Sequence, residues 1–372
     1  GRAKRLNSQL RSDGNSYCVM GVAPGMLPVL DQMFLTVLPT RKIYTFAGAG
    51  VALTLTFLTP ALPEEIDLLS RPVTYLAWEF KATDGRNHDV ALTFETTGEL
   101  AVNAPNQEVV SMTEEWGNLV AAVVGSREQP VLAKKGDDLR IDWGYLYVAF
   151  EKPAFTGLKL SGLRNGQPQV FQDDFRSRRE LQNPVAGEDL RVILEADLGR
   201  VGAQPVSRWL MLAYDDLYSI QYMKQNLRPY WRRNGWEAAD LLQAAARDYA
   251  ALAQRCAAFD AELMADLTRA GGERYAKIAA LAYRHCFAAS KFVADENGQP
   301  LSFSKENFSN GCIGTSDVFY PMAPQFLLFG PSLAKSFLVP FMNYAASDRW
   351  KFPFAPHDLG TYPHATGQVY GM

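Results

Sequence analysis

The sequence predicts a multidomain protein in which β structure precedes α structure, with an antiparallel β-sandwich over residues 1–235 and helices over residues 236–372. Two observations lead to this prediction. Up to about residue 235, apolar and polar residues alternate in short segments separated by turn-forming residues, as in strands with one buried face. After residue 236, apolar residues recur at steps of three and four, which is the spacing of one helical face.

The strands are predicted segment by segment from this alternation. In residues 51–57, Val51, Leu53 and Leu55 alternate with alanine and threonine. Further strands are predicted at 73–80, 90–96, 119–124, 139–141, 145–150, 191–196 and 208–213. Turn signals between them occur at Asp84-Gly85, 103–106, Lys135-Gly136-Asp137 and Asn165-Gly166. Many short strands without intervening helices favour an antiparallel sandwich.

Four helices are predicted in the second region. The first covers residues 237–267, and Gly271-Gly272 ends it. A second helix follows directly, so we expect an antiparallel helical hairpin. The residues expected on the inner side of this second helix are Ile278, Leu281, Ala282, His285, Cys286, Ala289 and Phe292. The last two helices are predicted at 317–328 and 332–346, and Pro331 suits the first turn of the latter.

Composition excludes several classes of protein. The chain has 372 residues, of which 48% are hydrophobic and 21% charged, so it has ample material for a folded core. The net charge of -3 offers no basic excess for binding nucleic acid. There is no run of 18 apolar residues for a membrane span. The four cysteines are scattered, which predicts neither a disulfide scaffold nor a CxxC metal site.

Two polar, glycine-rich segments, 302–317 and 352–370, are the candidate functional loops, because long loops on a rigid scaffold often carry sites. Two carboxylates from different loops could serve as acid and base. The candidate catalytic residues are Glu306, Asp317 and Asp358. The candidate substrate-binding residues are Lys305, Asn307, Asn310, His357 and Tyr362. No ligand spacing supports a metal site, and no cofactor is implied.

Structural alternatives exist for several of these residues. Both segments could be ordinary connections, with Asp317 as a helix N-cap. We do not expect His357 and Asp358 to form a dyad, because neighbouring side chains usually diverge. We expect His285, on an apolar helical face, to be a core histidine.

Several segments resemble one known family. They are 37–46, 54–60, 67–76, 142–147, and the two most specific ones, Asp317-Val-Phe-Tyr-Pro-Met-Ala-Pro-Gln325 and Phe354-Ala-Pro-His-Asp-Leu-Gly-Thr-Tyr-Pro363. With these segments the sequence resembles the glutaminase A-like family over essentially its whole length, as a Bacteroidetes-type member. The resemblance implies an N-terminal β-sandwich domain followed by an (α/α)6 six-hairpin toroid.

The resemblance also implies an activity, the hydrolysis of L-glutamine to glutamate and ammonia, and a periplasmic or extracellular location. Two alternatives stay open: a glycoside hydrolase of the six-hairpin type, and a non-catalytic module that binds carbohydrate or a partner. The substrate would be a small molecule, an amino acid or a sugar, and the oligomeric state is open. A complete toroid has more helices than the four predicted here. We therefore expect a fragment that holds the β domain and the beginning of the toroid, that is inactive alone if a catalytic acid lies elsewhere, and that exposes apolar surface on its last helices.

Overall fold

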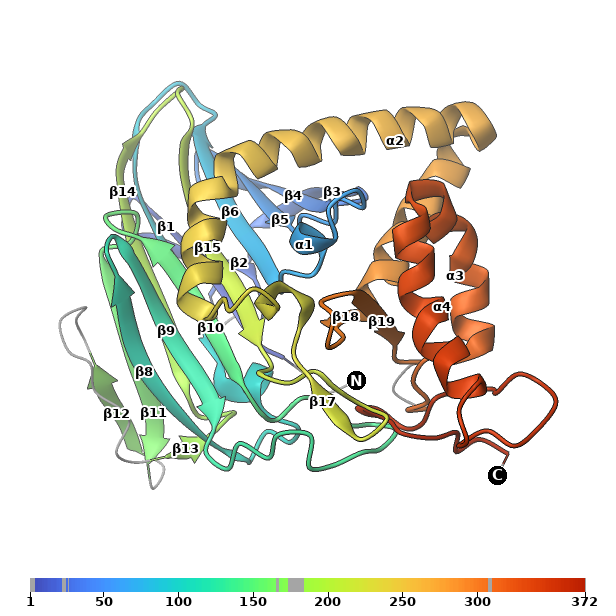
Figure 1. Ribbon diagram of the computed structural model, residues 1–372. Helices are drawn as coiled ribbons and strands as arrows, with labels where there is room; N and C mark the ends of the chain where they lie inside the picture. Colours follow the sequence, from blue (N-terminus) through green and yellow to red (C-terminus); the bar gives the residue numbers. More distant parts are fainter. Residues whose placement is uncertain are drawn as a thin grey trace.

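The structure is a computed structural model that describes residues 4–21, 25, 27–164, 167–172, 184–306 and 310–371. Its first part is mostly β-sheet and its last part is helical (Figure 1). The predicted order of a β region before a helical region is therefore confirmed. Among the described residues, no helix combines the length and apolar character needed to cross a membrane.

Two large sheets form the β region, and their neighbouring strands pair antiparallel. In the described part of the chain, the nine-stranded sheet contains, in spatial order, β13 (Val185–Ala186), β8 (Glu108–Trp116), β9 (Leu119–Ser126), β10 (Tyr145–Glu151), β15 (Val206–Asp215), β6 (Val73–Ala82), β5 (Val51–Leu58), β4 (Arg41–Gly48) and β3 (Asp31–Val37). The six-stranded sheet contains β12 (Gln167–Gln172), β11 (Gly157–Arg164), β14 (Arg191–Val201), β7 (His88–Thr97), β1 (Leu6–Ser12) and β2 (Asn15–Met20).

One hydrophobic core lies between these two sheets and draws residues from both. Trp78 of β6 and Phe94 of β7 meet across it, with ring centroids 5.7 Å apart in an edge-to-face arrangement. Most predicted strands coincide with observed ones. The strand predicted at 139–141 is wrong, because this segment lies in a loop in which the amide of Arg140 donates to the Asn103 side chain at 3.0 Å rather than to a neighbouring strand.

The outer face of the nine-stranded sheet is covered by α2 (Ala238–Ala288), a long helix with a break inside it (Figure 1). Trp209 of β15 stacks on Tyr249 of α2 at 4.2 Å. The buried Asp260 accepts hydrogen bonds from the amide and hydroxyl of Thr40 at 2.8 and 2.9 Å. The first part of α2 is therefore fixed on the sheet by both apolar and polar contacts.

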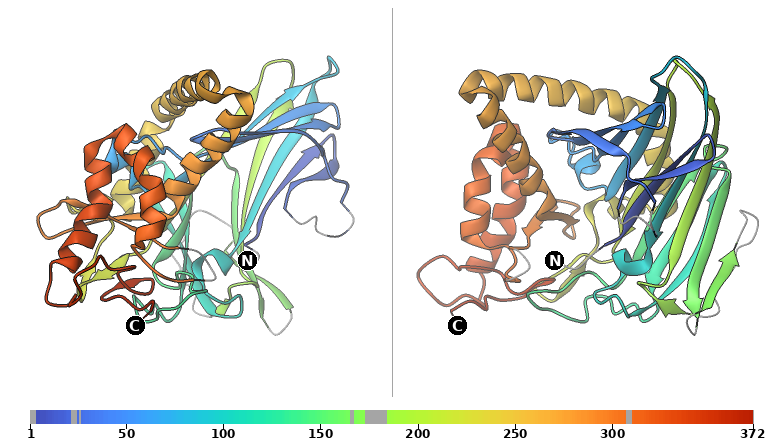
Figure 2. Two further views of the ribbon diagram at one scale, coloured as in Figure 1. Left: turned by 90° about the vertical axis from the view of Figure 1, so that its right-hand side faces the viewer. Right: turned by 180° about the vertical axis from the view of Figure 1, so that it is seen from behind.

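The break in α2 is at Gly272, whose φ of 80° lies in the left-handed region. From there the second part of the helix turns away instead of running back along the first part (Figures 1 and 2). The antiparallel hairpin predicted here is wrong, because a single non-helical residue is too short to reverse the chain.

The predicted inner side of the second part of α2 is also wrong. Its buried residues are Ala276, Ala280, Tyr283 and Phe287, whereas Ile278 is 69% exposed. Tyrosine and phenylalanine bury more apolar area than the alternative stripe, so they turn inward. In consequence His285, predicted as a core histidine, is exposed.

A β-hairpin that the sequence analysis missed follows α2. Its strands are β18 (Ser290–Ala294) and β19 (Pro300–Ser304), so Phe292 lies in a strand rather than in a helix. The helices α3 (Ser316–Phe329) and α4 (Pro331–Ala345) are confirmed, with Pro331 in the first turn. Together with the hairpin they enclose a second core. The short elements are α1 (Ile66–Leu69), η1 (Gly98–Ala101), η2 (Tyr230–Arg232), β16 (Ile220–Tyr222), β17 (Gln225–Leu227) and β20 (His364–Ala365).

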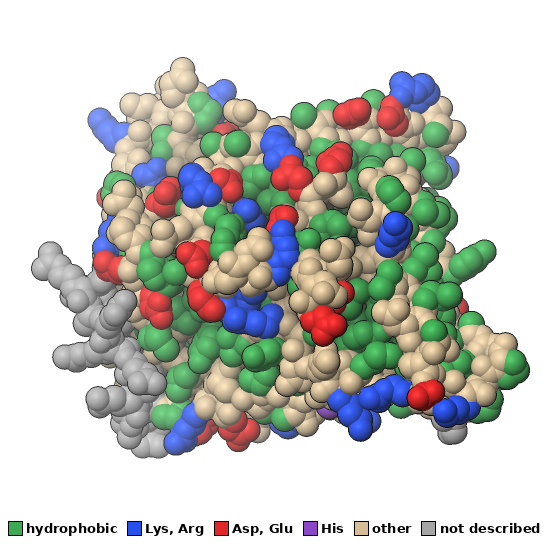
Figure 3. Space-filling view, viewed as in Figure 1, with side chains coloured by type: hydrophobic (Ala, Val, Ile, Leu, Met, Phe, Trp, Pro, Cys, Tyr) green, Lys and Arg blue, Asp and Glu red, His purple; other side chains and the backbone are tan. Residues whose placement is uncertain are grey.

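Apolar side chains are exposed on α3 and α4, as the sequence analysis expected. Tyr320, Leu328 and Leu327 are the most exposed of them. Figure 3 shows hydrophobic side chains gathered over these two helices. The chain then returns to the β region, because β20 pairs in parallel with β16.

Candidate functional site

The two candidate loops lie side by side. We call residues 305–315, between β19 and α3, the first loop, and residues 352–370, after α4, the C-terminal loop. The amide of Leu359 donates to the carbonyl of Ile313 at 2.9 Å, and the amide of Ile313 donates to the carbonyl of Gly360 at 3.0 Å. The amide of Tyr362 also donates to the carbonyl of Gly311 at 2.8 Å. Segments about fifty residues apart in the sequence thus form one structural unit.

A third loop from the β region completes this unit. It joins β9 to β10 over residues 127–144, where the sequence predicted a turn at 135–137 and a strand at 139–141. The carboxylate of Asp137 accepts the amide of Gly311 at 2.9 Å, and its carbonyl accepts the Lys305 ammonium at 2.9 Å. A Cβ atom at Gly311 would lie 2.5 Å from the carbonyl oxygen of Gly136, so glycine is required for this approach. The signals in the sequence were the turn at 135–137 and the family-like segment 142–147, and neither predicted a contact with the first loop.

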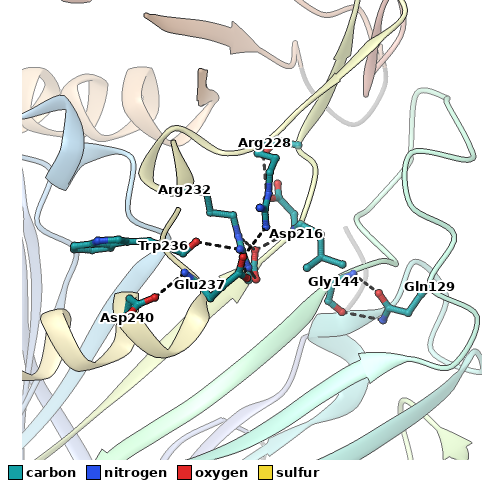
Figure 4. Close-up of polar contacts among 11 residues, drawn as sticks. Gln129, Gly144, Asp216, Arg228, Arg232, Trp236, Glu237 and Asp240 are labelled. Carbon is teal, nitrogen blue, oxygen red and sulfur yellow. Dashed lines mark hydrogen bonds and ion pairs between the residues drawn. The ribbon is translucent and has the colours of Figure 1, made fainter. Parts of the chain in front are cut away.

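The β9–β10 loop is held in place largely by its own side chains, such as Gln129 (Figure 4). Gln129 brackets Gly144, accepting its amide at 2.7 Å and donating to its carbonyl at 3.0 Å. The indole of Trp143 donates to the carbonyl of Tyr218 at 2.9 Å, and the buried Asp142 accepts from Gln107 at 3.0 Å. These contacts hold the β9–β10 loop in place beside the first loop.

Asp358 organises the C-terminal loop. Its fully buried carboxylate accepts amides from Gly360 at 2.9 Å, Val369 at 3.1 Å and Tyr370 at 3.2 Å. The remaining contact is to Nδ1 of His357 at 3.1 Å. The expectation that these neighbouring side chains diverge is therefore wrong. The amides draw the carboxylate inward, and stacking on Tyr370 at 4.5 Å holds the His357 ring beside it.

Asp317 lies in the first turn of α3 with its side chain 74% exposed. It is not the N-cap, because Thr315 occupies that position. A carboxylate in the first turn is favourable to the helix dipole. One carboxylate oxygen of Asp317 is 3.8 Å from Nε2 of His357, so the imidazole lies between two acidic groups.

The first loop contributes the remaining candidates. The amide of Glu306 donates to the carbonyl of Cys312 at 3.0 Å, and its carboxylate oxygen Oε2 is buried without a hydrogen-bond partner among the described residues. The side chain of Asn310 accepts the amide of Cys312 at 3.0 Å. Asn307 lies outside the described residues. A buried carboxylate oxygen without a donor is uncommon in folded proteins and calls for an explanation.

Burial changes the protonation behaviour of two further candidates. Desolvation lowers the pKa of Lys305, although Asp137 and Asp138 oppose this effect. Desolvation raises the pKa of Tyr362, and the nearby Asp216 adds to this effect. The Lys305 ammonium is 5.9 Å from the centre of the Tyr362 ring. The tyrosine therefore stays neutral and available as a hydrogen-bond donor at neutral pH.

A separate cleft of about 270 Å³ lies between α1 and the second part of α2. Its lining includes Leu69, Arg71, His285 and Phe287. It contains none of the candidate residues, so the candidate site is the meeting point of the three loops.

Two family models match the chain. One, described as a domain of unknown function, DUF5127, matches residues 40–266. The other, described as the glutaminase A six helical-hairpin domain, matches residues 272–372. The junction between the two matches coincides with the break in α2 at Gly272.

Two curated relatives share this sequence pattern. The chain is 27% identical to a protein named Glutaminase A from Aspergillus oryzae (strain ATCC 42149 / RIB 40), with 98% of this chain and 53% of that protein covered. It is 24% identical to a protein named "Probable glutaminase" from Arthroderma benhamiae (strain ATCC MYA-4681 / CBS 112371), with 87% and 39% covered. The chain thus spans about half the length, or less, of these relatives.

Similar solved structures include a family GH92 alpha-mannosidase from Bacteroides thetaiotaomicron, with a TM-score of 0.37 and 11% identity over 92% of this chain and 44% of that one. A putative kojibiose phosphorylase from the human microbiome gives a TM-score of 0.32 and 10% identity over 79% of this chain and 29% of that one. Because the DUF5127 model alone spans more than half of the sequence, and the six-hairpin model and the Glutaminase A relative cover the helical end, the chain belongs to the glutaminase A-like family.

Proposed function

We propose that the three-loop site belongs to a hydrolase that converts L-glutamine to glutamate and ammonia. The name of the Aspergillus relative, which matches over 98% of the chain, supports this reaction. The structural observation that supports the location is the buried Oε2 of Glu306 at the meeting point of the loops. Amide hydrolysis requires an activated water or nucleophile, a proton donor for the leaving ammonia, and groups that hold the amino acid.

Each candidate residue has a role in this proposal. Glu306 moves the proton, because its carboxylate oxygen is shielded from water and has no competing hydrogen-bond donor among the described residues. Asp317 and His357 form the solvent-accessible side of the site. Asp358 holds the C-terminal loop in place rather than reacting, since three amides occupy its carboxylate. The residues that line the site and contact the substrate are Lys305, Asn310 and Tyr362.

We propose the finer architecture on the same basis. The two sheets with their shared core would form the β-sandwich domain over residues 1–235. The helices over residues 236–372 would be the beginning of an (α/α)6 toroid, which the match to the six-hairpin model supports. The family resemblance also supports a periplasmic or extracellular location, which fractionation of expressing cells would test.

One observation favours the alternative of carbohydrate hydrolysis. Phe352 and Phe354 of the C-terminal loop are 46% and 61% exposed, and their rings stack at 5.3 Å. Exposed aromatic faces offer an apolar surface for sugar rings. Trp350, by contrast, is 7% exposed and belongs to the second core. This alternative therefore depends on the two phenylalanines.

Ammonia release from L-glutamine, measured beside a panel of aryl glycosides, tests the proposal. The assay uses the full-length protein, because the relatives are longer than this chain. We expect ammonia release from L-glutamine and no release of the aryl group. Cleavage of glycosides without ammonia release would contradict the proposal and favour a glycosidase. Absence of both activities would also contradict it, since a binding module gives that result.

A further inference from the structure

Three side chains with metal-ligand atoms lie close together where the first loop contacts the C-terminal loop. Cys312 comes from the first loop, and His357 and Asp358 come from the C-terminal loop. One ligand atom from each, the sulfur, an imidazole nitrogen and a carboxylate oxygen, lies within 4.8 Å of the other two. The backbone hydrogen bonds between Ile313 and Leu359 and between Ile313 and Gly360 hold the two loops at this distance.

The surroundings already fix the orientation of these groups. Asp358 is fully buried and is held by three backbone amides, and Cys312 is 4% exposed. Nδ1 of His357 faces the Asp358 carboxylate, while Nε2 lies 3.8 Å from Asp317. With Asp358 as a ligand, Asp317 lies on the opposite side of the His357 ring. A carboxylate in that position is the usual outer contact of a zinc-binding histidine, because it sets the tautomer and direction of the ring.

Two acidic residues lie near Cys312, namely Asp358 and Glu306, whose amide donates to the Cys312 carbonyl. Glu306 has a buried carboxylate oxygen with no hydrogen-bond partner in the described part of the chain. A divalent cation at this point would stabilise the thiolate and provide an electrostatic partner for the orphaned oxygen.

The kinds of ligand atom in the cluster indicate which metal ion it would bind. Sulfur and imidazole nitrogen suit zinc, whereas magnesium and calcium prefer sites built only of oxygen ligands. Three protein ligands leave a fourth tetrahedral position open, and the partly exposed His357 side chain lies on the accessible side. A catalytic thiol is the less favourable explanation, because reactive cysteines are partly exposed and Cys312 is buried.

We propose that Cys312, His357 and Asp358 form a zinc(II) site that joins the first loop to the C-terminal loop. This site rests on the geometry of the three ligands and holds whichever reaction the protein catalyses. The ligands are 45 positions apart in the sequence, counted from Cys312 to His357, so no short motif could reveal them.

Titration of the metal-free full-length protein with Co²⁺ tests the proposal without relying on activity. We expect one Co²⁺ per chain, with visible d–d bands and a near-ultraviolet charge-transfer band from the thiolate, and displacement by Zn²⁺. Cys312→Ser should abolish the charge-transfer band. Cys286→Ser, which changes a cysteine outside the cluster, is the matched control and should retain it. Absence of stoichiometric Co²⁺ binding, or a charge-transfer band that persists in Cys312→Ser, would overturn the proposal.

A second variant tests the proposal independently, in case Cys312→Ser does not fold. Asp317→Asn changes an exposed side chain whose contact with the cluster is through His357, so the fold is expected to survive. Loss of such an outer contact lowers metal affinity by roughly 10–100-fold. A Co²⁺ affinity equal to that of the wild type would contradict the assigned geometry.

Discussion

Replacement of Glu306 by Gln is expected to lower kcat for L-glutamine hydrolysis by about 10²–10⁴-fold, the usual contribution of a positioned acid or base. Glutamine keeps the size and shape of the side chain but cannot exchange a proton. The buried Oε2 has no hydrogen-bond donor among the described residues, so the substitution breaks no contact at that atom. The steady-state rate of ammonia release with the full-length protein is the measurement.

The fold should tolerate this change. Removing a negative charge from a shielded oxygen that lacks a partner carries no penalty of its own, so the free energy of unfolding should stay the same or rise. Glu296→Gln, an exposed glutamate in the turn of the β18–β19 hairpin, is the matched control and should keep full activity. A Glu306→Gln variant with wild-type kcat would show that the reaction uses another group.

Replacement of Arg232 by Met is expected to destabilise the protein by about 3–5 kcal/mol, as when one partner of a buried ion pair is removed. Arg232 is 3% exposed and lies just before α2. Its Nε donates to Asp215 of β15 at 3.1 Å, a second nitrogen pairs with the same carboxylate, and the third reaches Glu237 (Figure 4). One guanidinium therefore links the end of β15 to Glu237, the N-cap residue of α2.

The loss of stability in Arg232→Met arises from the Asp215 carboxylate, which stays buried without its arginine. Methionine preserves the apolar part of the arginine, but Asp215 would remain buried, and among the described residues the amide of Leu217, at 3.0 Å, would be the donor left to its carboxylate. Arg269→Met, which removes an exposed i,i+3 pair with Asp266, is the control and should change the free energy of unfolding by less than about 0.5 kcal/mol. The free energy of unfolding of both variants is measured by urea denaturation. Equal effects in the two variants would contradict a structural role for the Arg232 network.

The sequence predicted those elements whose local pattern agrees with their final packing. Buried and less buried residues alternate over residues 51–56 of β5 and 76–82 of β6, and α3 ends at Gly330 where α4 begins with Pro331. The prediction of the buried side failed for the second part of α2, because this segment carries two apolar stripes. Only the tertiary contacts of Tyr283 and Phe287 decide which stripe is buried.

The candidate site was predicted in part for a similar reason. Glycine-rich, polar composition marked both loops, but the role of Asp137 depends on a β-region loop that folds back onto the first loop. The pairing of His357 with Asp358 depends on amides from Val369 and Tyr370, which fix the carboxylate. Contacts of this kind join positions far apart in the chain, and no local pattern encodes them.

The central claim is that the ligand binds where the three loops meet, and amide hydrogen exchange measures this directly. The experiment compares the Glu306→Gln full-length protein with and without saturating L-glutamine, since this variant should bind without turnover. The account predicts slower exchange of the described amides in the first loop, the C-terminal loop and the β9–β10 loop, including those of Gly311 and Tyr362. Slower exchange confined to another surface, such as the cleft lined by Arg71 and His285, or no change at all, would contradict it.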